Sequence, residues 1–184
     1  MSEFHQEDLD ALIATLKRPH EPADLMCQVA EILQQRIGHK LFTILLVGAN
    51  REDTVRVYSN NLDAYPVNRV KRMGVTPWGS QVIHGCRTYI GKNDDDIRWA
   101  FPDHELIKSL GLSSALNVPI VYNGQCLAIL NLQHEANWYR DEHAEIAESV
   151  TPFLIPAMLG LRESFSTAKA GGASGHNNHN HGRN

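Results

Sequence analysis

The sequence predicts an α+β fold: an antiparallel sheet with helices from both ends of the chain on one face, and a pocket covered by loops and short helices on the other. Apolar residues recur at helical spacing near both ends, whereas the middle of the chain contains two predicted hairpins, at 41–60 and 113–133. The second hairpin includes Asn123-Gly124, the strongest short hairpin signal. With 184 residues, 42% of them hydrophobic, the chain can form one ordinary core.

Two amphipathic helices are expected first. The Arg18-Pro19 step ends the first, since a residue before proline avoids the helical region. Pro22 is a favourable first-turn residue for the second, and Gly38 is a natural stop. Both helices have a polar side, so they must pack on another element through their apolar faces: Leu9, Leu12, Ile13 and Leu16 in the first, and Leu25, Val29, Ile32 and Leu33 in the second.

The sheet is expected to begin with residues 41–48. This continuous apolar run predicts a central strand covered on both faces. Thr54–Asn60 alternates in polarity and predicts the partner strand of a hairpin. Residues 61–77 are predicted to be irregular, and a loop of this length inside a compact domain is often functional. Short elements are expected after it: a helix at 78–84, a strand at 87–90, a helical turn at 97–101 and a helix at 104–110.

The last part of the chain predicts strands at 113–121 and 125–133, followed by a long helix from about Asp141. Pro152 and Pro156 each remove a backbone donor, which predicts a kink or break at a local cost of about 3 kcal/mol. Residues 166–184 carry no large apolar side chain, so we expect a disordered, His-rich tail. The predicted organisation is therefore a helix and linker (1–19), one domain (20–165) and a tail (166–184).

Composition excludes several classes of protein. The net charge of −4 and the pI near 6.2 argue against nucleic acid as the main partner, because phosphate binding needs a basic surface. No apolar run reaches the roughly 18 residues of a membrane span, and the acidic N-terminus does not resemble a secretory signal. The three cysteines form no C-x-x-C pair. We therefore expect a protein of the reducing cytoplasm with no membrane partner.

Residues 111–132 resemble the GAF domain family. The family pattern is matched by a Gly-hydrophobic-x-Ser segment, a hydrophobic-Pro strand end, an Asn-Gly turn and a return strand with a small residue. The stretch before it, residues 87–111, resembles the family's pocket-covering segment, and the order of elements over roughly 22–163 agrees. The resemblance implies a sensor of a small molecule, since the family binds cyclic nucleotides, tetrapyrroles, metabolites and gases, and includes one kind of redox enzyme. The matching positions are Gly111, Leu112, Ser114, Val118, Pro119, Asn123, Gly124 and Ala128.

The chain departs from three branches of that family. Covalent bilin binders use a Cys-His pair, whereas this chain has His84-Gly85-Cys86. The cyclic-nucleotide signature of the phosphodiesterase branch is missing. Free methionine-R-sulfoxide reductases resemble this chain in size, but residues 87–113 contain none of the further cysteines that those enzymes use. A resolving thiol would have to be Cys126 or come from outside.

Candidate ligand-binding residues lie on the predicted hairpin and in the pocket cover. Asn117 and Asn131 are amides in apolar strands, and each needs a partner, which is either a ligand or a cross-strand hydrogen bond. Ser113 is a further donor or an ordinary strand start. The aromatic residues near the cover are Tyr58, Trp78, Trp99 and Phe101, and for each of them the alternative to forming a ligand wall is plain packing.

One basic side chain accompanies those aromatic residues. Arg98, next to Trp99, would suit a planar or carboxylate ligand in an aromatic-walled pocket. The alternative is a salt bridge to Asp94, Asp95 or Asp103.

Two further sets of residues suggest other chemistry. His84, Cys86 and His104 form a thiol-imidazole set, in which an imidazole would help to hold a reactive thiolate; the alternative is a buried, inert cysteine. In the tail, His176, His179 and His181 would chelate nickel, copper or zinc, either as a metal-handling segment or incidentally.

The preferred hypothesis is a stand-alone cytoplasmic sensory domain that binds a small molecule between its sheet and residues 61–110. The terminal helices, 9–33 and 141–163, suggest a homodimer, and signalling would pass through a protein effector. The alternatives are an enzyme that uses Cys86 and a metal-handling protein that uses the tail. The sequence identifies neither the ligand nor a cofactor.

Overall fold

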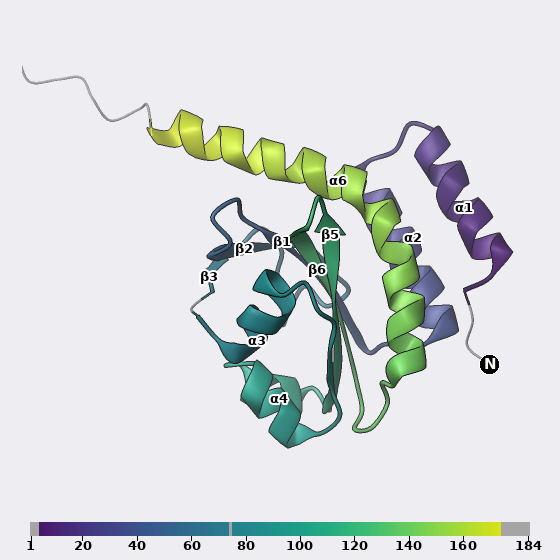
Figure 1. Ribbon diagram of the computed structural model, residues 1–184, viewed down its shortest axis with the longest axis vertical. Helices are drawn as coiled ribbons and strands as arrows, with labels where there is room; N and C mark the ends of the chain where they lie inside the picture. Colours follow the sequence, from purple (N-terminus) through teal and green to yellow (C-terminus); the bar gives the residue numbers. More distant parts are fainter. Residues whose placement is uncertain (1–3, 74, 174–184) are drawn as a thin grey trace, which may run out of the picture.

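A six-stranded antiparallel sheet forms the centre of the molecule, with the strand order β3-β2-β1-β6-β5-β4 (Figure 1). The computed structural model describes residues 4–73 and 75–173, with side chains up to residue 165. The strands are β1 (Leu41–Val47), β2 (Asp53–Ser59), β3 (Val70–Arg72), β4 (Tyr89–Gly91), β5 (Ser114–Tyr122) and β6 (Gln125–His134).

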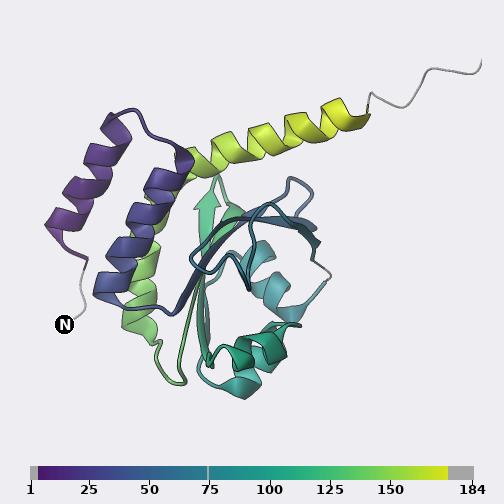
Figure 2. The same cartoon turned by 180° about the vertical axis from the view of Figure 1, so that it is seen from behind.

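Helices cover both faces of this sheet, as the α+β prediction requires (Figure 2). The terminal helices α2 (Pro22–Arg36) and α6 (Asp141–Ala173) lie on one face, and α1 (Gln6–Lys17) packs on the outer side of α2. The other face is covered by short elements, namely α3 (Pro77–Gly79), the π-helix η1 (Ser80–His84), α4 (Asp94–Ala100) and α5 (His104–Ser109).

Strand β1 illustrates how the sequence produces two covered faces. Phe42, Ile44 and Leu46 point toward the long helices and belong to the main hydrophobic core. Leu45 and Val47, on the opposite face, belong to a second hydrophobic cluster with α3 and η1 residues such as Trp78. The continuous apolar run therefore reflects burial on both sides of one strand, as predicted.

Strand β2 departs from strict alternation. The register places Ile44 opposite Tyr58 but Leu45 opposite Arg56, so Val57 has no direct partner and forms a bulge. The bulge sends Tyr58 to the helix face, where its ring meets Phe42 edge-on at 5.6 Å between centroids. Arg56 stays on the opposite face of the sheet.

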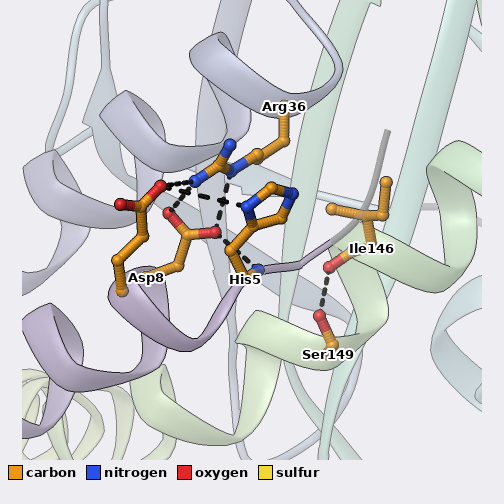
Figure 3. A network of polar contacts seen from close by, with 6 residues as sticks. His5, Asp8, Arg36, Ile146 and Ser149 are labelled. Atoms are coloured by element: carbon orange, nitrogen blue, oxygen red, sulfur yellow. Dashed lines mark hydrogen bonds and ion pairs between the residues drawn. The ribbon is translucent and has the colours of Figure 1, made fainter. Parts of the chain in front are cut away.

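Helix α1 is fixed to α2 by an ion pair. Arg36 donates to both oxygens of Asp8, from Nε at 2.8 Å and from Nη2 at 3.0 Å (Figure 3). Nη2 also donates to Glu7 at 2.6 Å. The Asp8 side chain is only 5% exposed. Burial raises its pKa, but the hydrogen bonds from Arg36, the backbone hydrogen bond from His5 and the charges of Arg36 and His5 together outweigh burial and hold the pKa below its ordinary value.

Helix α6 continues through both prolines and changes direction part-way along its length (Figure 1). Pro152 cannot donate to the carbonyl of Glu148; the hydroxyl of Thr151 donates to that carbonyl instead, at 2.9 Å. The bend agrees with the predicted kink. The helix reaches Ala173, whereas the sequence predicted a loss of structure from residue 166, because Ala and Lys near its end favour propagation of an existing helix.

The segment Asp141–Phe165 of α6 is long and apolar enough to cross a membrane by length and composition. Its apolar face packs on the sheet and on α2, through residues such as Val150 and Leu154, which are fully buried. This packing is that of a core helix, and membrane crossing is not needed to explain its composition.

Most other element boundaries agree with the sequence within a few residues. The main addition is β3, which lies inside the segment predicted to be irregular. The hairpin turn has the expected conformation, since Asn123 and Gly124 have φ angles of 48° and 71°.

Candidate functional site

A cavity of about 300 Å³ lies between the sheet and the cover on the face opposite the long helices. Its position matches the predicted pocket between the sheet and residues 61–110. The sheet contributes side chains from β1, β2 and β6, and the cover contributes side chains from the β2–β3 connection, α3, the end of α4 and α5. The lining residues are Leu41, Thr43, Leu45, Thr54, Arg56, Tyr65, Arg69, Val70, Lys71, Met73, Trp78, Ala100, Phe101, Pro102, Asp103, Ile107, Asn131 and Gln133.

A chain of hydrogen bonds crosses the sheet beside this cavity. Trp78 Nε1 donates to Asn117 Oδ1 at 3.0 Å, and Asn117 Nδ2 donates to Asn131 Oδ1 at 2.8 Å. Asn131 Nδ2 then donates to Thr43 Oγ1 at 3.4 Å. The three strand residues are direct cross-strand neighbours on β5, β6 and β1. The two asparagines therefore bond to each other across the strands, which was the alternative to contact with a ligand. Their hydrogen bonds also hold Trp78 over the sheet.

Arg56 is a lining residue with incomplete hydrogen bonding. Its Nη1 donates to the carbonyl of Pro66 at 3.2 Å, and its guanidinium carbon lies 4.8 Å from the ring centre of Tyr65. Its Nε is buried and has no partner among the described residues. Burial lowers the pKa of Arg56, although Tyr65 and Asp103 nearby act in the opposite direction. An unpaired buried donor costs about 1–3 kcal/mol, and more when it is charged.

Gln133 is the second such residue. It is 5% exposed, lines the cavity from β6, and its Oε1 is buried without a partner in the described part of the chain. Its neighbours across the sheet, Leu41 and Ala115, are apolar and offer it no side-chain donor. Two residues that line one cavity therefore each carry a buried polar atom without a partner among the described residues.

The single acidic residue of the lining is already engaged. Asp103 Oδ2 accepts a hydrogen bond from the hydroxyl of Tyr65 at 3.1 Å. Burial, followed by the charge of Asp103, raises the pKa of Tyr65, so this tyrosine stays protonated. The contact fixes the β2–β3 connection to the start of α5 and closes one side of the cavity.

The structure separates the predicted ligand-binding residues into two groups. Trp78 and Asn131 line the cavity, and Asn117 is bonded to both of them. Tyr58, Arg98, Trp99 and Ser113 do not line it. Tyr58 packs against the Phe42 ring, and Arg98 forms an ion pair with Asp95 at 2.9 Å. The Trp99 ring stacks on the Tyr89 ring at 5.4 Å between centroids, and the Ser113 hydroxyl donates to Asp94 at 2.5 Å.

The thiol-imidazole set is not assembled. His84 borders one surface hollow and His104 another, while Cys86 lies with Arg87 and Thr88 in a third. None of the three lines the main cavity. The Cys86 Sγ approaches only backbone carbonyls, at 3.9 Å and 4.0 Å.

No group of three or more metal-ligating side chains occurs between residues 4 and 165, residue 74 aside. His176, His179 and His181 lie outside the described residues.

The sequence reasoning missed the basic residues of the cavity. Arg56 had a detectable signal, because it alternates with Val55 and Val57 in a predicted strand and so faces away from the main core. Arg69 and Lys71 had no such signal, since β3 is only three residues long.

Comparisons with known proteins agree with this architecture. A family model described as the GAF domain matches residues 22–154. No curated protein matches the chain. The solved structures that it resembles include a GAF domain from a phosphoenolpyruvate-protein phosphotransferase of Coxiella burnetii, with 14% identity, 87% of this chain and 95% of that chain covered, and a TM-score of 0.66.

The descriptions of two other similar structures refer to a substrate or a chromophore. Free methionine-R-sulfoxide reductase from Neisseria meningitidis, in complex with its substrate, has 17% identity and a TM-score of 0.63, covering 89% of this chain and 99% of that chain. A bacteriophytochrome chromophore-binding domain from R. palustris has 12% identity and a TM-score of 0.62, and the match covers 87% of this chain and 61% of that chain. At these identities the likeness shows the fold alone.

Proposed function

Because the chain belongs to the GAF domain family, we propose that it is a sensory domain whose small-molecule ligand occupies the cavity between the sheet and its cover. The observation that carries this proposal is the cavity itself. Its volume of about 300 Å³ falls at the lower end of the range for small-molecule sites. Its walls are apolar with a few convergent polar groups, which is the usual composition of such a site.

The cover supplies a route from ligand to signal. The β2–β3 connection is held against the sheet by the contacts of Arg56 with Pro66 and of Tyr65 with Asp103. A ligand that contacts Arg56 would favour the closed arrangement of this segment over an open one, because it binds that arrangement more tightly.

We further propose that the protein works in the cytoplasm as a homodimer that acts on a protein effector. Three free cysteines in the described region suit a reducing compartment. The C-terminal half of α6 extends past the sheet, which leaves a helical surface available to a second copy (Figure 1). Light scattering on the full chain should give twice the monomer mass, 20.6 kDa; a monomer at micromolar concentration would contradict this part.

Native mass spectrometry tests the proposed function. The wild-type protein, incubated with an extract of small molecules from the producing cell, should retain an organic mass after buffer exchange. Thr43→Trp places a ring on the floor of the cavity and should abolish that mass. Val121→Trp is the matched control, since it adds the same ring at a strand position outside the cavity, 37% exposed, and should retain the mass. Equal retention by both variants would contradict the proposal.

A further inference from the structure

Two half-buried guanidinium groups, those of Arg36 and Arg56, differ in how their edges are used. Arg36 uses its Nε–Nη2 edge to hold the two oxygens of Asp8, as Figure 3 shows. This side-on arrangement is the preferred geometry for a carboxylate. The hydrogen bonds of the described residues leave the same edge of Arg56 unused, because only Nη1 has a partner and Nε is buried without one.

The pKa values show the same contrast. Hydrogen bonds to Asp8 and Glu7 raise the pKa of Arg36. Burial lowers the pKa of Arg56, and the charges of Tyr65 and Asp103 oppose that effect only in part. Arg56 is therefore a partly buried cation whose Nε has no acceptor among the described residues.

The charge of the cavity lining has the opposite sign to that of the chain. The chain carries a net charge of −4. The lining contains three basic residues, Arg56, Arg69 and Lys71, and one acidic residue, Asp103, which is bonded to Tyr65. Arg69 and Lys71 are exposed, so they lie where they can attract an anion from solution before it reaches Arg56.

The remaining walls limit what else the anion can carry. Leu41, Leu45, Phe101 and Ile107 are apolar and suit a hydrocarbon or aromatic body. Gln133 adds one unpaired amide oxygen, which accepts a hydrogen bond from an N–H or O–H group.

We propose that the ligand is a small organic acid with an apolar body, that its carboxylate is held by the Nε–Nη2 edge of Arg56, and that Gln133 selects acids that also carry a hydroxyl or amino group. This inference rests on the proposed function, since it names the class of ligand for the same cavity. It assigns the recognition of the anion to Arg56 on β2, not to Arg98 on α4.

The test is an NMR titration of the full chain, labelled with ¹⁵N, against benzoate and against its neutral analogue benzamide. The indole N–H of Trp78 reports occupancy of the cavity, whatever the charge of the probe, because Trp78 lines it. The Nε–H of Arg56 reports contact with the anion. The indoles of Trp99 and Trp138, which do not line the cavity, are internal controls.

We expect benzoate to shift the Trp78 and Arg56 signals together and saturably, and benzamide to bind about 10- to 100-fold more weakly, the range expected for a hydrogen-bonded charge. Arg56→Gln should lower benzoate affinity by a similar factor. Arg98→Gln removes the same charge from α4 and should leave the affinity unchanged.

Four results would overturn the inference. If benzamide binds as tightly as benzoate, or if Arg56→Gln binds benzoate like the wild type, the cavity takes ligands without selecting an acid, and the proposed function stands alone. If phenyl phosphate binds at least about tenfold more tightly than benzoate, the site is built for a phosphate and not for a carboxylate. If no probe shifts the Trp78 signal, both the inference and the proposed function fail.

The role of Gln133 is tested separately with the three hydroxybenzoates. At least one isomer should bind more tightly than benzoate to the wild type, and Gln133→Leu should abolish that gain while keeping benzoate binding. An unchanged preference in Gln133→Leu would remove Gln133 from the site. The wild-type comparison of benzoate with benzamide needs no variant, so it remains decisive even if one of the variants does not fold.

Discussion

Asn117→Ala should destabilise the domain strongly, because it breaks two hydrogen bonds in a place that water does not reach. Asn117 is fully buried. Its removal leaves Trp78 Nε1 without an acceptor and Asn131 Oδ1 without its 2.8 Å donor. Each orphaned group costs about 1–3 kcal/mol, so the free energy of unfolding should fall by about 2–6 kcal/mol. That is a large part of the 5–15 kcal/mol by which a domain is typically stable.

Urea denaturation measures this loss, with Gln35→Ala on the exposed side of α2 as the control for removing a carboxamide. A double-mutant cycle with Trp78→Phe refines the test. Each single variant leaves the partner unpaired, so the double variant should lose less than the sum of the two, by about 0.5–3 kcal/mol. A loss below about 1 kcal/mol in Asn117→Ala, or strict additivity in the cycle, would refute the reasoning.

Two further predictions concern pH. Asp8→Asn should lower the free energy of unfolding at pH 7; because the folded-state pKa of Asp8 is held below its ordinary value, the difference from wild type should persist above about pH 5 and shrink as the pH falls below about 3.9. A difference that does not change with acidification would show that Asp8 does not act through its charge. His39 is a base, yet its contribution to stability also falls as the pH falls. Burial lowers its pKa although its Nε2 lies 3.0 Å from the Ala30 carbonyl, and its Nδ1 is buried without a partner among the described residues. Its stabilising contribution is therefore present above about pH 6.5 and is lost on acidification. Proton NMR should give His39 a midpoint below the ordinary histidine value of about 6.5, and a midpoint at or above that value would contradict this.

The architecture could be predicted from the sequence because its signals are local. The apolar run at 41–48, the Asn123-Gly124 turn and the amphipathic spacing of the terminal helices each specify an element and the face that it buries. The two prolines of α6 indicated a change of direction for the same reason. Strand β3 could not be predicted, since three exposed residues carry no periodicity.

The cavity residues were harder to predict, because they depend on register. Alternation alone places Arg56 and Tyr58 on one face of β2, and the bulge at Val57 separates them. Tyr58 was therefore among the candidate aromatic residues, although it packs on the helix side. Arg98 was a reasonable candidate as a basic residue beside aromatic ones, but the first turn of α4 offers it Asp95 at 2.9 Å. Asn117 and Asn131 were identified because buried amides on paired strands must find partners. Trp78 was identified as one of the aromatic residues of the cover.

A crystal structure of the protein soaked with benzoate tests most directly the central claim, that the cavity under the cover is an organic-acid site. The account predicts benzoate inside the cavity, with both carboxylate oxygens about 2.7–3.0 Å from Nε and Nη2 of Arg56 and its ring against Leu45 and Phe101. Benzoate bound at Arg98, or an occupied cavity in which Arg56 makes no contact with the carboxylate, would contradict the account.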